Sequence, residues 1–276
     1  MTLLTIDEST CNRDGICAAV CPTGIIDFSK GEVPRLTDNA QEYCIACGHC
    51  VAVCPTASVS HEKMAADRCP PIRPELQLTA DQCEQFLRSR RSIRRYKQEP
   101  VDRSKIQRII EIASHAPSGH NSQSVQWRVI DNRPRIERLA ATVIDWMRWM
   151  MGNQPEVAAA LHMARAVERW EAGNDVILRG APVLVAAHAP ENDRTAPPAC
   201  TIALAYMELA AVPMGLGACW AGYFWAASQG FPATVEALDL PSGHRCHGAL
   251  MVGYPRFTYH RLPLRRQPEV SWWDER

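Results

Sequence analysis

The sequence lacks three features that would assign it to a broad functional class: an excess of charge, a long apolar run and a basic leader. Its 30 basic and 30 acidic residues balance, so electrostatics give no support for binding nucleic acid or an acidic membrane surface. No apolar run approaches the roughly 18 residues that a membrane-spanning helix needs. The opening MTLLTIDEST has no basic stretch followed by an apolar one, so we expect no signal peptide and a cytoplasmic location.

Cysteine, by contrast, is abundant, with 12 residues in a chain of 276. Because no export signal is expected, these thiols indicate metal ligands or reduced side chains and not disulfides. Seven lie between Cys11 and Cys54, while the other five share no common spacing and are expected to be small buried side chains. The length allows one large domain or two, and 46% apolar residues suffice for an ordinary core.

The N-terminal segment contains a repeat with an offset of 33 residues. CNRDGICAAVCP (11–22) aligns with CIACGHCVAVCP (44–55), and only Asp14 breaks the cysteine match, at the position of Cys47. The second copy follows C-x2-C-x2-C-x3-C-P, in which three thiolates surround one face of an iron–sulfur cube and the fourth ligates the other cluster. The repeat therefore predicts two clusters that cross-brace one small domain. Zinc is disfavoured, because its sites use pairs of cysteines and not triplets with a trailing Cys-Pro.

Residues 1–62 resemble the bacterial two-cluster ferredoxins, a resemblance that implies a ligand set for each cluster. One cluster would be bound by Cys44, Cys47, Cys50 and the crossed-over Cys21. The other would be bound by Cys11, Cys17 and the crossed-over Cys54.

Asp14 is placed to supply the remaining ligand, because a carboxylate oxygen is anionic and fits this spacing. Some similar ferredoxins carry Asp in this position with a glycine beside it, as Gly15 is here. The weaker ligand predicts a labile corner, [4Fe–4S] when intact and [3Fe–4S] after oxidation. In the alternative interpretation Asp14 faces solvent and the cluster always holds three irons.

Residues 63–78, KMAADRCPPIRPELQL, predict a semi-rigid linker between a domain at 1–62 and a second at 79–276, since the Pro70–Pro71 pair favours extended backbone. Thr79, three residues before Gln82, predicts a capping box at the start of a helix.

The stretch 90–130 combines an arginine cluster, a helix and a turn-rich segment. Arg90, Arg91, Arg94 and Arg95 offer bidentate donors to a phosphate, although a lone arginine run is more often a solvated face. Apolar residues at helical spacing predict a helix around 106–113 that ends before Pro117. PSGHN then permits close backbone approach to a ligand.

This composite, RRSIRRY…IIEIA…APSGHNSQ…W, resembles the nitroreductase family of FMN enzymes, and the resemblance covers nearly all of 80–276. GAPVLVAAHA (180–189) is similar to that family's central strand, TIALAYMELAAVPMGLGACWAGYF (201–224) to its core helix and flavin-facing loop, and ALMVGYPRFTYHRLPLRRQP (249–268) to its last strand and basic closing segment. The resemblance implies an α+β fold, with an antiparallel or mixed sheet flanked by helices in an intertwined homodimer.

The resemblance also implies which residues contact FMN. Arg90, Arg91 and Ser92 would hold the phosphate and ribityl chain, and Arg265 or preferably Arg266 would add to the phosphate site. Arg94 would lie near flavin N1 and O2, where positive charge stabilises the reduced anion. The partner subunit would supply Pro117, Ser118, Gly119 and Asn121, so the site exists only in a dimer. The backbone N–H of Gly222 would donate to flavin N5, the atom that passes hydride.

Two departures from the family pattern stand out. QSVQW follows the loop where many members have Gln-Pro-Trp, and Ala221–Gly222 replaces a common Glu-Gly pair, which removes a carboxylate and keeps the backbone donor. Residues 215–217, GLG, lack a third glycine and follow a helix, so they predict a helix cap and not a dinucleotide fingerprint.

Substrate signals are weak. The Trp- and Met-rich segment 144–170 either lines a pocket for a flat acceptor or forms the buried face of dimer helices, and we favour the dimer helices. Candidate proton donors are His115, His120, His188 and His244, with a slight preference for His120.

We therefore expect an iron–sulfur flavoprotein that passes electrons from an external low-potential donor, such as reduced ferredoxin or flavodoxin, through two clusters to FMN. A small organic acceptor, nitroaromatic or quinone-like, would receive them. Two alternatives stay open. In one, NAD(P)H reduces the flavin and the clusters carry electrons outward to a protein. In the other, the chain is a redox carrier or sensor without a small substrate.

Overall fold

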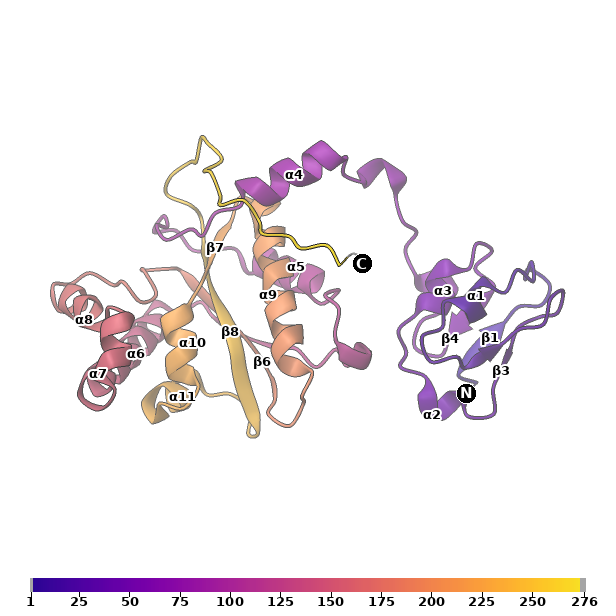
Figure 1. The fold of residues 1–276 in the computed structure, drawn as a ribbon, viewed down its shortest axis with the longest axis horizontal. Helices are drawn as coiled ribbons and strands as arrows, with labels where there is room; N and C mark the ends of the chain where they lie inside the picture. Colours follow the sequence, from indigo (N-terminus) through magenta and orange to yellow (C-terminus); the bar gives the residue numbers. More distant parts are fainter. Residues whose placement is uncertain (1, 274–276) are drawn as a thin grey trace. The chain divides into compact units, whose positions relative to one another are not determined.

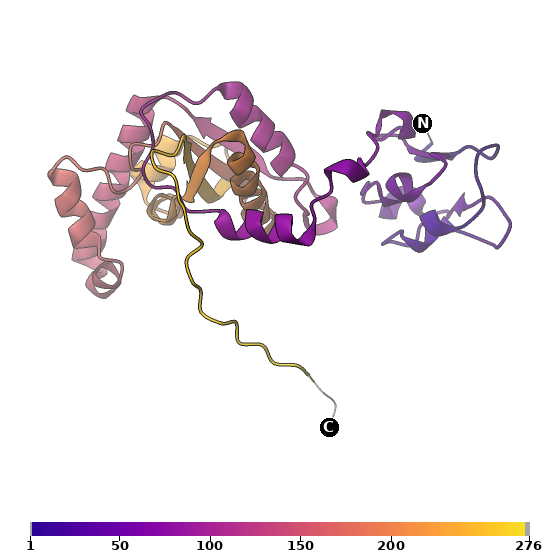
Figure 2. The same ribbon diagram turned by 90° about the horizontal axis from the view of Figure 1, so that it is seen from above.

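The computed structural model describes residues 2–273, and its contacts divide the chain into two units (Figures 1 and 2). The N-terminal unit contains the chain up to Gln77 together with Pro117–Gln123. The second unit contains Leu78–Ala116 and the chain from Ser124 onward. Most of the expected linker, residues 63–77, thus groups with the N-terminal unit, as does a short loop from far along the chain.

The N-terminal unit consists of two small antiparallel sheets and short helices, two of which recur at the offset of the sequence repeat. Strand β1 (Leu4–Ile6) pairs with β4 (Val59–His61), and β2 (Ile26–Asp27) pairs with β3 (Arg35–Leu36). Helices α1 (Ile16–Ala19) and α3 (His49–Val53) begin 33 residues apart. The other short elements are α2 (Ala40–Tyr43) and the 3-10 turns η1 (Ala66–Arg68) and η2 (Pro74–Leu76).

The two copies of the repeat share backbone conformation as well as sequence. Left-handed φ angles recur at the 33-residue offset, at Arg13 (55°) and Ala46 (49°), and again at Gly15 (72°) and Gly48 (75°). A side chain at either glycine would also collide with a neighbour, since an added Cβ would lie 2.3 Å from the Phe28 ring or 2.9 Å from the Met64 sulfur. The left-handed φ favours glycine at the start of both α1 and α3, and at Gly15 the ring of Phe28 also leaves no room for a Cβ.

A four-stranded antiparallel sheet organises the second unit, in the order β5-β6-β8-β7. Its strands are β5 (Gln126–Ile130), β6 (Val183–Pro190), β7 (Gly217–Trp220) and β8 (His244–Gly253). The apolar run expected to form the central strand is β6, which is buried along almost its whole length. Such a continuous apolar run forms when both faces of a strand are covered.

Helices cover the two faces of this sheet (Figure 1). Alternate residues of β6 point to opposite sides, so Val183 and Val185 pack with one hydrophobic cluster while Leu184 packs with the other. The first cluster is formed with α5 (Arg103–Ala113) and α9 (Ala196–Ala211). The second is formed with α6 (Arg133–Asn153), α8 (Met163–Glu171), α10 (Gly222–Ser228) and α11 (Pro232–Leu238). The remaining elements are α4 (Ala80–Ser89), α7 (Pro155–Ala160) and the 3-10 turns η3 (Gly119–Asn121) and η4 (Val212–Met214).

In the second unit, two predictions that rest on the spacing of residues along the sequence are confirmed. Helix α4 begins at a capping box in which Thr79 and Gln82 satisfy each other's backbone N–H. The expected helix around 106–113 is α5, which begins at Arg103 and ends at Ala113, before Pro117. None of the helices within residues 2–273 combines the length and apolarity needed to cross a bilayer.

The Trp- and Met-rich segment forms α6 to α8 and divides between core and surface. Trp146 and Met150 are buried in the unit's own core. Trp149 is 47% exposed. Packing within one chain accounts for this burial, and the expected role of the segment in dimer helices stays a prediction.

Candidate functional site

Four thiols of the N-terminal unit line one small cavity: Cys21, Cys44, Cys47 and Cys50. We call it the Cys44 cavity. Three of these side chains come from the second copy of the repeat, and Cys21 arrives from the first, just after α1. Its walls also include Ile25, Ile26 and His61. This is the set of thiols that the sequence predicted for one cluster.

The remaining three cysteines of the repeat, Cys11, Cys17 and Cys54, form the Cys11 group. Burial raises the pKa of the Cys17 thiol, and the charges of Cys11 and Cys54 raise it further. Burial likewise raises the pKa of Cys50 to about 11, with Cys47, Cys21 and Cys44 as its charged neighbours. The charges that act on these two thiols thus come from within the two predicted sets, and the binding of iron by each set stays a prediction.

The two crossing thiols have equivalent surroundings. The Sγ of Cys21 lies 3.6 Å from the Thr23 hydroxyl, and the Sγ of Cys54 lies 3.6 Å from the Thr56 hydroxyl. Burial alone would raise the pKa of each thiol, but hydrogen bonds from the neighbouring threonine and backbone outweigh it and lower the pKa. These donors favour the thiolate, the form that binds metal.

His61 is a contributor to the Cys44 cavity that the sequence did not reveal. Its ring is 4% exposed, and burial lowers its pKa, so the neutral form is favoured. Because Nδ1 accepts the Lys63 N–H at 3.0 Å, the proton of the neutral ring is on Nε2. Nε2 lies 3.6 Å from the Cys44 sulfur, so His61 is placed to donate to that thiolate.

Asp14 lies exposed in the loop before α1, where its Oδ1 accepts the Ile16 N–H at 3.1 Å. This bond caps the turn and occupies one lone pair of one carboxylate oxygen. The side chain thus has a local structural role, and its role as an iron ligand stays a prediction.

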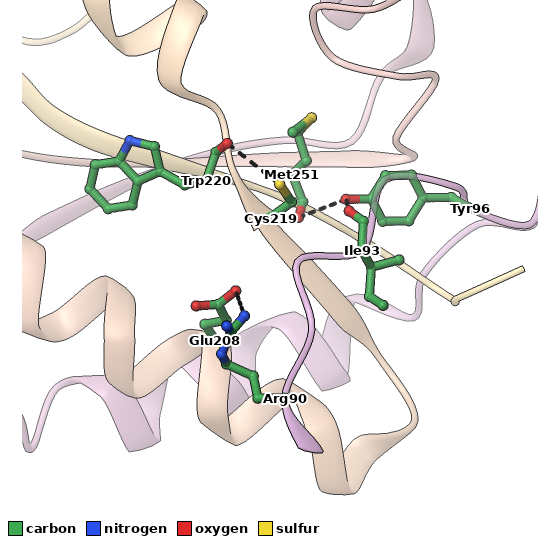
Figure 3. Close-up of polar contacts among 7 residues, drawn as sticks. All are labelled: Arg90, Ile93, Tyr96, Glu208, Cys219, Trp220 and Met251. Carbon is green, nitrogen blue, oxygen red and sulfur yellow. Dashed lines mark hydrogen bonds and ion pairs between the residues drawn. The ribbon is translucent and has the colours of Figure 1, made fainter. Parts of the chain in front are cut away.

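The second unit contains a pocket of about 370 Å³ that we call the Arg90 pocket. Its walls include Arg90, Arg91, Glu208, residues 215–218 and residues 257–259. Arg90 is paired with Glu208 of α9 at 2.9 Å (Figure 3), and the Arg91 guanidinium lies 5.9 Å from the centre of the Tyr259 ring. Gly215 caps η4 in the left-handed conformation, as the cap interpretation of GLG predicted.

Residues 93–97 run beside β7 and the end of β8. The Ile93 N–H donates to the Ala218 carbonyl at 2.9 Å. The buried Tyr96 hydroxyl reaches the carbonyls of Ile93 (2.6 Å) and Met251 (3.3 Å), as Figure 3 shows. Gly217 permits this close approach, because an added Cβ would lie 2.3 Å from the Ile93 side chain. Ile93 and Tyr96 are thus anchored, and Arg94 and Arg95 between them are exposed.

Arg94 is part of a concentration of positive charge. Burial lowers the pKa of Arg179, and the charges of Arg94 and Arg95 lower it further, so the three guanidinium groups are near one another. Burial raises the pKa of Cys219 in β7, and the charge of Arg94 and a hydrogen bond from Ser92 oppose that rise. An anion bound at this position would relieve the mutual repulsion of the guanidinium groups.

Two family models match the chain. A 4Fe-4S dicluster domain matches residues 3–55, and the nitroreductase family matches residues 87–254. The chain belongs to the nitroreductase family. It is an oxidoreductase that carries a 4Fe-4S dicluster domain at its N-terminal end.

Known proteins agree with this assignment. An NADH dehydrogenase from Thermus thermophilus is 30% identical over 197 residues, which cover 64% of this chain and 90% of that protein. A nitroreductase with bound FMN from Bacteroides fragilis has a TM-score of 0.58 at 19% identity, covering 69% of this chain and 98% of that one. Another, with bound FMN, from Desulfitobacterium hafniense has a TM-score of 0.55 at 23% identity, covering 67% and 93%. At these identities the two structures establish a shared fold.

The nitroreductase-family loop PSGHN has an unexpected location. Pro117–Gln123, which we call the Asn121 loop, belongs to the N-terminal unit. The Asn121 side-chain amide donates to the carbonyls of Ile45 (3.1 Å) and Ala46 (2.9 Å), beside the Cys44 cavity. The predicted flavin contacts of Pro117, Ser118, Gly119 and Asn121 stay predictions.

Other predicted flavin residues differ in how close they lie to the Arg90 pocket. Gly222 is the first residue of α10, where a backbone N–H has no acceptor inside the helix. Arg265 and Arg266 lie exposed in the irregular C-terminal segment, whereas Phe257, Thr258 and Tyr259 of that segment line the pocket. A phosphate contact from Arg265 or Arg266 therefore stays a prediction.

The candidate histidines do not gather at the Arg90 pocket. His188 is 4% exposed and its Nδ1 lies 3.0 Å from Nδ1 of His244, with burial lowering the His188 pKa to about 4. This pair is at the end of β8 opposite Val252 and Gly253, which pair with β7. His115 and His120 are exposed.

We predict that Arg90→Ala destabilises the protein by about 1–3 kcal/mol at neutral pH, because it leaves the Glu208 carboxylate half-buried without its partner. Burial already raises the pKa of Glu208, and loss of Arg90 raises it further. The folded state then binds a proton that the unfolded state releases, so stability falls as pH rises from 4.5 through the raised pKa. Below 4.5 the deficit disappears.

Chemical denaturation at several pH values measures this effect. The control is Arg88→Ala, which removes an arginine from an exposed pair with Glu84 and should leave stability nearly unchanged. The double variant Arg90→Ala/Glu208→Gln should recover most of the loss. An Arg90→Ala deficit that is independent of pH, or no larger than that of Arg88→Ala, contradicts the assignment.

Proposed function

We propose that the protein takes up electrons one at a time at two iron–sulfur clusters and delivers them in pairs, at an FMN site, to a small organic acceptor. The observation that carries this proposal is the presence in one chain of the Cys44 cavity and the nitroreductase-family unit. Clusters exchange single electrons, whereas reduction of an organic molecule requires two, so such a fusion has a chemical rationale.

The cysteine sets support two clusters with different ligands. The cluster of the Cys44 cavity would be [4Fe–4S], held by four thiolates. The cluster of the Cys11 group would be [4Fe–4S] or [3Fe–4S], with Asp14 as the fourth ligand in the larger form. The crossing of Cys21 and Cys54 would tie each half of the repeat to both clusters.

The second unit offers groups that fit FMN. Arg91 and Ser92 would hold the phosphate end, with Arg90 kept in place by its pair with Glu208. Arg94 and Arg179 would place positive charge near the pyrimidine ring, which favours a reduced anionic flavin. The Gly222 N–H would donate to flavin N5. Bound FMN would supply hydride transfer, and the relatives described above with bound FMN support this choice.

We propose a homodimer as the active form, because in the nitroreductase family the loop equivalent to PSGHN would reach the flavin of the partner subunit. The exposed apolar residues of the C-terminal segment fit this proposal. Leu264 is 97% exposed, Trp272 83% and Trp273 96%, an arrangement that favours burial against a second copy.

A second candidate function reverses the electron flow. The relative from Thermus thermophilus carries the name NADH dehydrogenase, which favours NAD(P)H as a reductant of the flavin. The clusters would then carry electrons outward to a protein acceptor. This route needs no dinucleotide fingerprint if the nicotinamide stacks on the flavin.

Anaerobic stopped-flow mixing separates the two directions. We expect reduced methyl viologen, a low-potential donor, to bleach the clusters first and the flavin second, and a nitroaromatic or quinone to reoxidise the flavin. NADH or NADPH alone should reduce the flavin slowly. Rapid flavin reduction by a nicotinamide, followed by cluster reduction, would establish the reverse direction, and a flavin that no acceptor reoxidises would indicate a carrier or sensor.

We predict that Asp14→Cys makes the Cys11-group cluster, which is otherwise air-sensitive at the iron bound by Asp14, stable to air. The wild-type protein should gain a [3Fe–4S] EPR signal after brief exposure to air, because a carboxylate is the weaker iron ligand. The variant should keep two four-iron signals under the same exposure. Identical signals and equal resistance to air in both proteins would show that Asp14 does not bind iron.

A further inference from the structure

The two halves of the repeat differ in what holds their cluster-binding loops. In the second half, both hydrogens of the Asn121 amide are used, one by the carbonyl of Ile45 and one by that of Ala46. Two carbonyl oxygens can face only a donor, which fixes the orientation of this amide. In the first half, the corresponding residues are Asn12 and Arg13, and the bond seen there runs from Arg13 to Gly31 within the same repeat.

The loop that contains Ile45 and Ala46 has an unfavourable backbone conformation. Ala46 has a φ of 49°, a left-handed conformation that costs energy for a residue with a Cβ. Its N–H lies 3.4 Å from the Cys44 sulfur. By binding the carbonyl of the Ile45–Ala46 peptide and the carbonyl of the following peptide, Asn121 favours the conformation in which the Ala46 N–H faces the thiolate.

Asn121, which binds these two carbonyls, lies in the nitroreductase-family part of the chain. The family model spans residues 87–254, and the Asn121 loop lies within it, between α5 and β5. By contacts, however, the loop groups with the cysteine repeat. The same segment is the one that the family resemblance assigns to the flavin. A single loop thus connects the sequence of one domain with the cluster-binding backbone of the other.

A second difference between the halves concerns the sulfur itself. His61 is placed to donate to the Cys44 thiolate, whereas the residue 33 positions earlier is Phe28, which has no donor. Hydrogen bonds to cluster sulfur reduce its effective negative charge and raise the reduction potential. The cluster of the Cys44 cavity should therefore accept electrons more readily than its counterpart.

We propose that the cluster of the Cys44 cavity is the one that passes electrons to the flavin, and that Asn121 is the positioning residue that holds it for this transfer. The inference rests on the proposed function. An electron from the external donor would enter at the Cys11-group cluster and move to the Cys44-cavity cluster. That cluster would be oxidised by one electron as the flavin is reduced by one. Two such transfers, with proton uptake, would complete the reduction.

The test uses the anaerobic holoprotein with two replacements of Asn121. Asn121→Asp sets a carboxylate against the two carbonyls, and Asn121→Gly removes the side chain; both residues tolerate the native φ of 53°. The control, Asn174→Ala, removes a similar amide that donates to the Ala172 carbonyl in the second unit. Measurements are the rate of cluster loss to an iron chelator, the EPR signal of each cluster, FMN content, and flavin reduction by reduced methyl viologen.

Both Asn121 variants should lose the Cys44-cavity cluster about tenfold faster, a factor equivalent to about 1.4 kcal/mol and to one or two lost hydrogen bonds. Flavin reduction should slow, while the other cluster keeps its EPR signal and its rate of loss. His61→Phe, which copies the first repeat, should shift the potential of the Cys44-cavity cluster alone to more negative values. Asn174→Ala should match the wild type.

Three results overturn the inference: equal effects on both clusters, wild-type rates of cluster loss and flavin reduction, or loss of FMN with both clusters unchanged. The last would mean that Asn121 serves the flavin directly. If the wild-type flavin is not reduced through the clusters at all, the proposed function is wrong. The chelator rates then still show whether Asn121 holds the loop.

Discussion

The exchange of one thiol between the two halves of the cysteine repeat is the constraint on which the N-terminal unit depends. Cys21 leaves its own repeat to join three thiols of the other, and Cys54 joins Cys11 and Cys17. The apolar core of this unit is small, with Leu3, Leu4, Ile25, Ile26, Val51 and Val59 among its buried members. A unit of this size needs further cross-links, and metal clusters bound across both halves would provide them.

The second unit has a different constraint, the mutual repulsion of neighbouring guanidinium groups. Arg90, at the end of α4, is balanced by Glu208, whereas the group around Arg179 has no comparable ion-pair partner among the described residues. An anionic cofactor would complete that balance. The two units thus offer binding groups of opposite charge. Thiolates in the N-terminal unit would bind iron, and guanidinium groups in the second unit would bind a phosphate and stabilise a reduced flavin.

Features that depend on neighbours in sequence could be predicted, and features that depend on distant pairing could not. The capping box at Thr79 and the helix before Pro117 follow from local spacing. The cysteine sets are an exception, because the resemblance of the 33-residue repeat to two-cluster ferredoxins implied their distant pairing. Glu208 pairs with an arginine 118 positions away, and nothing in its own surroundings in sequence marks it. His61 could have been suspected, because comparison of the two repeats sets it against Phe28.

The same reasoning explains the location of the Asn121 loop. Its family resemblance predicted contact with a flavin, because related sequences place it there. The carbonyls that it binds belong to a domain fused ahead of the family region, and no pattern inside the loop encodes that partner. A contact between segments so far apart in the sequence needs a structure to reveal it.

The most direct test of the central claim is the cofactor content of protein purified without oxygen. The account predicts brown, dimeric protein with close to one FMN per chain and about seven to eight irons per chain, with acid-labile sulfide to match. Colourless, monomeric protein without iron or flavin, in a chain that is otherwise folded, would contradict it.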